Sequence, residues 1–268
     1  MKKRLTGVLC ALMGAAALLA LLCTVILNTV LSSGVMNTAF GELSPADWQR
    51  VAKFGVSSAE SQKYADAIVT YLSGEGEVVT VTNAEGIQVN AFEDDENKQN
   101  IHMSQVRDVI SFMKVYRYIG GGIALAVFAL TYILCYRKKK SMPANLLLKG
   151  FADGSMIVLS LSLILLVWGL IDFEGLFYTL HLILFPGTDT WLLDWDKHLL
   201  MALMPRSFFT YYAKKLLVSV LPILGIMVFL IIARFKLGAA GKEADVNSGT
   251  EKPDETKKTK DSDKNDEL

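Results

Sequence analysis

The chain has 268 residues, of which 52% are hydrophobic and 20% are charged, and its formal net charge is zero. The apolar residues gather into long charge-free runs, which argues against an ordinary soluble domain. Acids outnumber bases in the segment 33–117, which argues against a nucleic-acid partner. All three cysteines (Cys10, Cys23 and Cys135) lie in apolar runs, so the other segments hold no disulfide or thiolate metal site.

Four apolar runs predict four membrane-spanning helices. A run must contain about 20 residues to cross the hydrocarbon core, where backbone amides can bond only to one another. A cleaved signal peptide is the alternative for the first run, because Lys2, Lys3 and Arg4 precede it, but its length favours an uncleaved anchor. The expected division of the chain is 1–32 (N-terminus and first span), 33–117 (outer domain), 118–136 (second span), 137–154 (basic loop), 155–171 (third span), 172–215 (outer interfacial loop), 216–233 (fourth span) and 234–268 (disordered tail).

Basic residues predict the orientation of the spans. One cluster precedes the first span, a second follows the second span at 137–140, and Arg234 and Lys236 follow the fourth. With four crossings the three clusters share one side, which the positive-inside rule makes cytoplasmic. Both termini are then cytoplasmic and the outer segments are extracytoplasmic. Lys214 and Lys215, at the outer end of the fourth span, do not follow this rule. The sequence therefore predicts a multi-pass protein of the cell membrane.

The outer domain, 33–117, is expected to be small and of mixed α/β structure. Ser44 before Pro45 is typical of a capped helix start, and a second helix is expected from Ser58. Alternating apolar and polar residues at 77–82 and 87–92, with turn residues between them, predict a β-hairpin. A further amphipathic helix should run from about Asn100 toward the second span. The fold class is thus all-α and membrane-integral, with a small mixed domain and an interfacial helix.

The second outer segment contains a stripe of aromatic residues around one imidazole. Phe173, Phe177, His181 and Phe185 recur at steps of four, which places them on one face of a helix. The segment is too short to span a membrane, so we expect an amphipathic helix at the outer interface, where Trp191 also belongs. The alternative for the rings is simple packing of this helix against the bundle.

The candidate catalytic residues are His102 and His181, one in each outer segment. Both lie near span ends on the same side of the membrane, so we expect the two residues to approach each other at the outer interface. No acid, base or histidine lies within the spans, which argues against a transporter, and no general catalytic motif occurs. A neutral imidazole can accept a proton near neutral pH. His198 lies among the charged residues 194–197, so a solvated or salt-bridged role is expected for it.

Three further polar residues, Arg107, Asp194 and Asp196, are candidates for a site. Arg107, on the same predicted helix as His102, either grips a substrate or lies on a solvated helix face. Asp194 and Asp196, taken with a histidine, match no metal-ligand spacing, so neither a metal nor a cofactor is expected.

The chain resembles the lipoprotein intramolecular transacylases. The resemblance rests on His102-Met103 and Val106-Arg107 ahead of a span, and on Tyr71-Leu72-Ser73-Gly74. It also rests on the stripe Phe173, Phe177, His181 and Phe185, followed by Trp191, Asp194, Leu200, Pro205, Phe208 and Phe209. It extends through the fourth span. Three positions depart from the family pattern, which has acids in place of Gln99, Gln105 and His198.

The resemblance implies transfer of an acyl chain within a diacylglyceryl-cysteine lipoprotein, from a glycerol ester to the N-terminal amine. His102 and His181 would then be catalytic, and the substrate-binding residues would be Phe173, Phe177, Phe185, Trp191, Arg107 and Asp194. Diacylglyceryl lipoproteins and membrane phospholipid are the implied partners. The alternatives are a non-catalytic envelope sensor or assembly factor and, less favoured, a transporter subunit.

Overall fold

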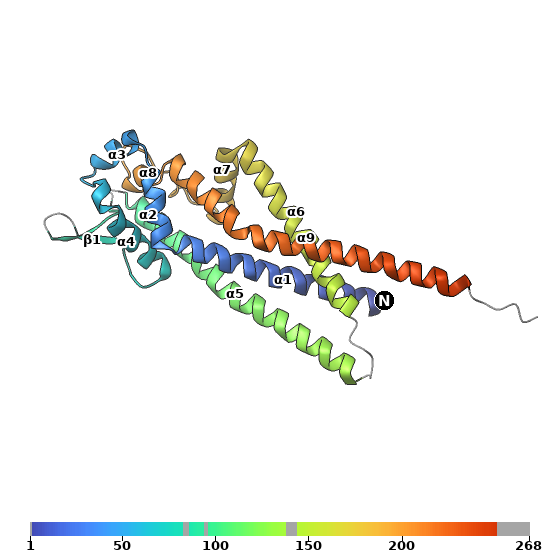
Figure 1. The fold of residues 1–268 in the computed structure, drawn as a ribbon. Coiled ribbons are helices and arrows are strands. Elements are labelled where there is room, and N and C mark those ends of the chain that lie inside the picture. Colours follow the sequence, from blue (N-terminus) through green and yellow to red (C-terminus); the bar gives the residue numbers. More distant parts are fainter. Residues whose placement is uncertain (1, 83–85, 94–95, 138–143, 251–268) are drawn as a thin grey trace, which may run out of the picture.

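Four long helices lie lengthwise beside one another and carry a small domain at one end (Figure 1). The computed structural model describes residues 2–82, 86–93, 96–137 and 144–250. Helix α1 packs against the other three long helices, and α6 also packs against α9. These helices are α1 (Lys2–Val30), α5 (Lys98–Arg137), α6 (Ala144–Ile171) and α9 (Arg206–Thr250).

The structure confirms the predicted fold class, because all four long helices are long and apolar enough to cross a membrane. Helix α5 exceeds what a bilayer requires. Its first twenty residues include Arg107, Asp108, Lys114 and Arg117, so the charge-free part from Tyr118 is the part suited to hydrocarbon. The candidate spans are Gly7–Val30, Lys98–Leu130, Leu148–Ile171 and Arg206–Leu237.

Small residues let the backbones of α1 and α6 touch. A Cβ added to Gly14 would lie 2.9 Å from the Gly150 carbonyl oxygen and from the Phe151 Cα, and one added to Gly154 would clash with the Ala15 backbone. Such close approach is how helices associate in lipid, where no hydrophobic effect drives them together.

Gly154→Leu should therefore separate α1 from α6 and destabilise the folded protein. Overpacking a close contact costs about 1–3 kcal/mol, and here the clash involves backbone that cannot rotate away. We expect a lower thermal midpoint in detergent and less protein in membranes. Gly121→Leu on α5 is the matched control, because nothing lies within 4 Å of a Cβ at that position. Equal midpoints for the two variants would contradict this account of the contact.

The small domain is built from short capped helices around one hydrophobic core, which includes Phe40, Ile68 and Phe92. Ser44 accepts a hydrogen bond from the Asp47 amide and Asp47 caps in return, as the Ser-Pro pair predicts. The core also receives Leu203 from the second outer segment. The elements are α2 (Ser33–Gly41), α3 (Pro45–Ala52), the 3₁₀ turn η1 (Ser58–Glu60), α4 (Ser61–Ser73), β1 (Thr80–Thr82), β2 (Gln88–Asn90) and α8 (Leu199–Leu203).

The predicted hairpin is present but shorter than expected. Strands β1 and β2 pair antiparallel with Val81 opposite Val89, and each holds three residues rather than six. Val81 is buried whereas Val89 is exposed, so only one strand contributes to the core. Residues 83–85 of the expected turn lie outside the described part of the chain.

The expectation of a disordered tail is wrong for its first part, because α9 continues to Thr250. Apolar periodicity ends near residue 240, but no proline occurs between there and Lys252, so nothing in the sequence forces the helix to end earlier. Residues 251–268, and 138–143 of the basic loop, lie outside the described residues.

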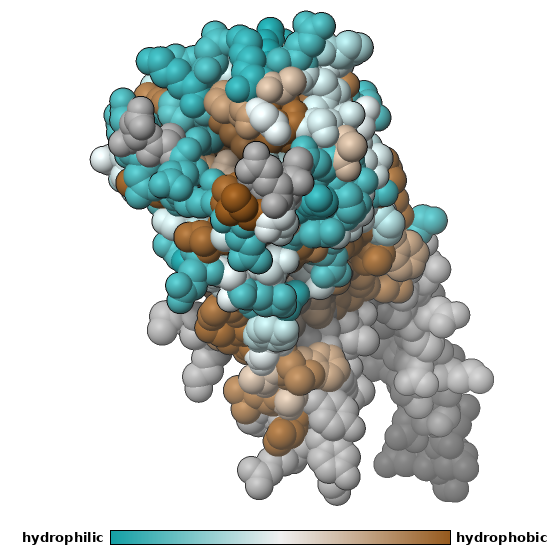
Figure 2. Space-filling model, turned by 90° about the vertical axis from the view of Figure 1, so that its left-hand side faces the viewer, coloured by the Kyte–Doolittle hydropathy of each residue, from teal (hydrophilic) through white to brown (hydrophobic). Residues whose placement is uncertain are grey.

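The interfacial helix is α7 (Phe173–Leu184), which packs against α6 near the small domain (Figure 1). The Asp172 side chain caps it by accepting a hydrogen bond from the Gly175 amide. Leu182, Ile183 and Leu184 are exposed on it. Seen from the end that carries the small domain, the molecule is mostly hydrophilic, with hydrophobic residues below it along the long helices (Figure 2).

Candidate active site

The fold brings His102 and His181 together although the second and third spans separate them in the sequence. Helix α5 carries His102 one turn from its start, and α7 carries His181 one turn before its end. Their rings stack with centroids 5.8 Å apart and planes 30° apart. The prediction that the two histidines approach each other is confirmed.

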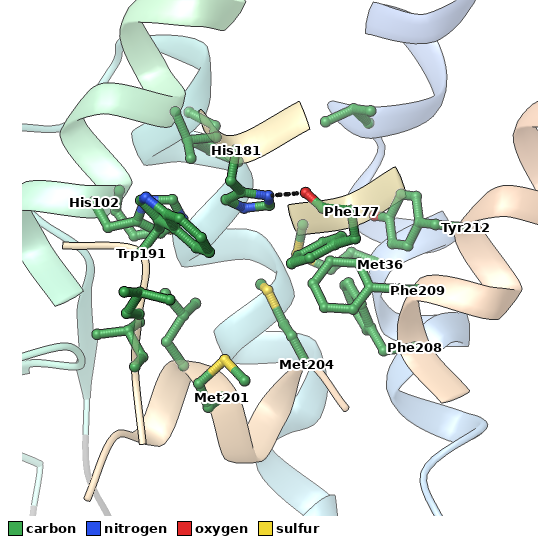
Figure 3. A pocket seen from close by; sticks show the side chains of 17 residues that line it. Met36, His102, Phe177, His181, Trp191, Met201, Met204, Phe208, Phe209 and Tyr212 are labelled. Atoms are coloured by element: carbon green, nitrogen blue, oxygen red, sulfur yellow. Dashed lines mark hydrogen bonds between the residues drawn. The ribbon is translucent and has the colours of Figure 1, made fainter. Parts of the chain in front are cut away.

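Both imidazoles line one cavity of about 450 Å³. That volume lies within the range of small-molecule sites, and the wall is mainly hydrophobic, as such sites usually are. The close-up shows the two imidazoles at one side of a group of aromatic rings and methionines (Figure 3). The lining residues are Val30, Met36, Leu72, His102, Met103, Val106, Phe177, His181, Trp191, Leu192, Leu193, Leu200, Met201, Met204, Phe208, Phe209 and Tyr212.

Aromatic rings surround the His181 imidazole. Its centroid lies 4.1 Å from that of Phe177, 5.1 Å from that of Trp191 and 5.5 Å from that of Phe185. Phe185 also meets His102 edge-on at 5.1 Å. The ring of Phe173 contacts that of Phe177 in a tilted arrangement, with centroids 6.1 Å apart, and does not line the cavity. Of the predicted stripe, Phe177 and Phe185 therefore contact the His181 imidazole, and Phe177 also lines the cavity.

A backbone hydrogen bond fixes the tautomer of neutral His181. Its Nδ1 lies 2.8 Å from the Phe177 carbonyl oxygen, the contact drawn as a dashed line in Figure 3. A carbonyl can only accept, so Nδ1 must carry the hydrogen. The lone pair of neutral His181 is consequently on Nε2, which is the nitrogen able to take a proton.

His102 is held neutral by its surroundings. The side chain is buried, and burial, reinforced by the neighbouring His181, lowers its pKa to about 4. Burial also lowers the pKa of His181, against the opposing effect of the Phe177 carbonyl. Among the described residues His102 Nδ1 has no hydrogen-bond partner. Both imidazoles are therefore neutral at pH 7, and one offers an unused ring nitrogen.

These shifts predict acid sensitivity. A histidine in the unfolded chain has a pKa of about 6.5, and the folded protein here lowers it. The free energy of unfolding is therefore highest above pH 6.5 and decreases as the pH falls toward 4. For His102 this decrease in the free energy of unfolding is about 3 kcal/mol. The thermal midpoint of the wild type should fall over this window, and His102→Gln should flatten the curve. An equal pH dependence in both proteins would contradict the assigned burial.

Comparison with known proteins identifies the family. The model of the lipoprotein intramolecular transacylase Lit family matches residues 11–209, which is most of the chain. The chain belongs to the lipoprotein intramolecular transacylase family. None of the curated proteins matches it.

Solved structures share the fold. The lipoprotein intramolecular transacylase Lit from Bacillus cereus is 20% identical and superposes with a TM-score of 0.58, covering 90% of this chain and 97% of its own. Two variants of that protein, in which a histidine is replaced by arginine or by alanine, give TM-scores of 0.53 and 0.54 at 20% and 19% identity. They cover 90% of this chain and 94% and 95% of their own.

Two of the positions at which this transacylase departs from the family pattern hold the second outer segment against α5. Gln105 accepts a hydrogen bond from the Thr190 hydroxyl at 2.8 Å, and its amide nitrogen lies 3.5 Å from the Thr188 hydroxyl. Buried Gln99 accepts a hydrogen bond from the Leu200 amide at 2.7 Å. The amides of Gln99 and Gln105 thus join the two halves of the site.

The expectation that His198 is solvated or salt-bridged is wrong. The side chain is only 8% exposed, and its Nδ1 lies 2.9 Å from the Asp194 amide nitrogen and 3.1 Å from the Asp194 carbonyl oxygen. His198 directly precedes α8, and it is buried because the leucines of that helix pack into the core. The neighbouring charges do not indicate that His198 is exposed, because Lys197 and the Asp194 carboxylate pair with each other on the surface at 4.0 Å.

Four predicted substrate-binding residues do not line this cavity, namely Phe173, Phe185, Arg107 and Asp194. Arg107 donates to the Gly76 carbonyl oxygen and lies over the Tyr71 ring, 4.6 Å from its centroid. The Asp194 side chain is half exposed and accepts from the Asp196 amide. No group of three or more His, Cys, Asp or Glu in the described ranges could hold a metal ion.

The sequence did not predict that α9 contributes to the cavity wall, although Phe208 and Phe209 belong to the family resemblance. Phe208 and Tyr212 are four residues apart on that helix, with ring centroids 4.9 Å apart, and Phe209 lies 5.1 Å from Phe177. The spacing of 208 and 212 was available as a signal. This spacing lies between Arg206 and the Lys214-Lys215 pair ahead of the fourth span, and it does not indicate that this face of the helix meets α7.

Proposed function

We propose that this transacylase moves one acyl chain within a diacylglyceryl-cysteine lipoprotein, from a glycerol ester to the N-terminal amine. The product is the N-acyl, S-monoacylglyceryl form. The observation that carries the proposal is a pair of neutral imidazoles on the wall of an otherwise apolar cavity. Because donor and acceptor belong to one molecule, the enzyme needs no nucleophile of its own.

His181 is the proposed general base. Its Nδ1–H is held by the Phe177 carbonyl, which leaves Nε2 free to take a proton from the attacking amine. The nitrogen–acyl carbon bond forms, the tetrahedral intermediate collapses, and the carbon–glycerol oxygen bond breaks. The proton on Nε2 then passes to the departing glycerol oxygen, so the imidazole is neutral again at the end of the cycle.

His102 is the proposed donor to the oxyanion of that intermediate. Its low pKa keeps it neutral, so it offers one N–H and does not compete for the proton of the amine. The stacked rings, 5.8 Å apart, allow both imidazoles to face one tetrahedral centre. Intramolecular positioning of amine and ester supplies a further several kcal/mol.

The site is proposed to face the extracytoplasmic side, with both termini in the cytoplasm. The start of α1, the end of α5, the start of α6 and the far part of α9 lie toward the end of the molecule opposite the small domain (Figure 1). Basic residues of those segments include Lys2, Arg137, Lys149 and Arg234. Acyl chains leave lipid at a cost of about 0.8 kcal/mol per CH₂, so the cavity must receive them from the outer leaflet beside α7.

Tandem mass spectrometry of lipoprotein N-termini tests the proposal in cells. Host strains with and without this chain would be compared. Because transfer within one molecule conserves mass, we expect an unchanged intact mass and a fragment ion that places one acyl chain on the cysteine amine. A mass gain of one acyl chain would instead indicate transfer from phospholipid, and an unchanged fragment pattern would support a non-catalytic role.

A further inference from the structure

One polar group in the cavity wall has no role in the chemistry described so far, namely the hydroxyl of Tyr212. The side chain is 8% exposed, and its oxygen is buried without a hydrogen-bond partner among the described residues. Its ring lies on the cavity wall with Phe208 and Phe209, on the far side of Phe177 from His102 (Figure 3).

The other polar side chains of the wall have assigned partners or roles. Trp191 donates its Nε1–H to the Thr188 carbonyl at 3.1 Å, and His181 donates to the Phe177 carbonyl. His102 Nδ1 and the Tyr212 hydroxyl are the unpartnered polar atoms among the described lining residues. A buried polar group without a partner is costly and rare, so an unpartnered hydroxyl in a cavity points to a ligand that completes it.

The chemistry of the substrate supplies a matching acceptor. A diacylglyceryl group carries two ester carbonyls, and only one reacts. The other must enter the same apolar cavity, where its oxygen finds no water and needs a donor. A phenol is a donor suited to this site, because it can bond a neutral carbonyl without bringing a charge into an apolar wall.

We propose that Tyr212 donates a hydrogen bond to the carbonyl oxygen of the ester that remains on glycerol. This inference rests on the proposed function, and it deepens that function by naming how the enzyme chooses between two esters. Holding the retained ester at Tyr212, away from the imidazoles, leaves the other ester beside His181. Tyr212 is then a binding residue that sets which chain is transferred.

The test pairs Tyr212→Phe with two synthetic lipopeptides. One carries two esters, and the other has an ether at the retained position and therefore no carbonyl for Tyr212 to bind. On the diester we expect kcat/KM to fall about tenfold, mostly through KM, because the bond exists before and during reaction. On the ether substrate the wild type and Tyr212→Phe should agree within about twofold.

Tyr211→Phe is the control, since Tyr211 lies beside Arg206 and Lys214 in a surface depression rather than in the cavity. It should leave both substrates unaffected. Tyr212→Phe should also keep or raise the thermal midpoint, because the lost hydroxyl bonds nothing in the protein.

Equal losses on the two substrates would overturn the inference, because the hydroxyl would then act elsewhere, for example on the peptide. No loss on the diester, or a lowered thermal midpoint, would also overturn it. A wild type that converts neither lipopeptide would overturn the proposed function as well, which separates the two failures.

Discussion

His181→Ala should reduce transacylation by about 10²–10⁴-fold, because it removes the only base proposed for the attacking amine. The side chain lies outside the long helices, so membrane insertion should be unchanged. Its hydrogen bond to Phe177 fixes the tautomer, and no other described wall residue presents a free basic nitrogen apart from His102. The rate would be measured with a synthetic diacylglyceryl lipopeptide and reconstituted protein, normalised to folded protein.

His102→Ala should be comparably severe, through loss of the donor to the oxyanion. The double variant should be little worse than either single one, since groups that act on one centre are not additive. His198→Asn is the control, because an amide can replace the bond to the Asp194 backbone and His198 does not line the cavity. Full activity of His102→Ala together with a dead His198→Asn would reverse our assignment.

The second large effect is expected for Phe177→Asp, which places a carboxylate on the cavity wall at a position whose native ring centroid lies 4.1 Å from that of His181. An anion there should repel acyl chains and also raise the pKa of His181, since opposite charges favour the imidazolium. A protonated His181 has no lone pair for the amine, so turnover per folded molecule should fall by about 10²-fold or more.

Phe177→Leu separates this account from simple packing, because it keeps an apolar side chain at the same position. Phe177→Leu should retain most of the activity, with a modest loss of stability because the leucine side chain is smaller than the phenyl ring. The measurement compares lipopeptide conversion with protein abundance in membranes for each variant. If Phe177→Asp lost abundance in proportion to conversion, the ring would serve packing alone and would leave the proposed site.

Features set by local pattern were predictable from the sequence. Charge-free runs marked the spans, the Ser44-Pro45 pair marked a cap, and steps of four marked the face of α7 that carries His181. The meeting of His102 with His181 followed from topology and the family resemblance rather than from any local signal. Topology placed both at one end of the bundle, and packing then brought their rings together.

Features set by long-range packing were not predictable. The bond between Gln105 and Thr190 joins residues 85 apart in sequence, and burial of His198 follows from the docking of α8. Tyr212 lines the cavity only because α9 packs close to α7, and the residue pattern of neither helix predicts that contact. The resemblance implies that Arg107 binds substrate, yet its guanidinium donates to the carbonyl of Gly76, a residue 31 positions away that no local pattern connects with it.

A label-crossover experiment tests the central claim most directly. Two diacylglyceryl lipopeptides of different peptide sequence, one with deuterated acyl chains and one without, would be mixed with the purified protein in one membrane preparation. Transfer within a single molecule predicts that every N-acylated product keeps its own label and its original intact mass. Products in which the deuterated chain appears on the amine of the other peptide would contradict that prediction, and with it the proposed intramolecular reaction.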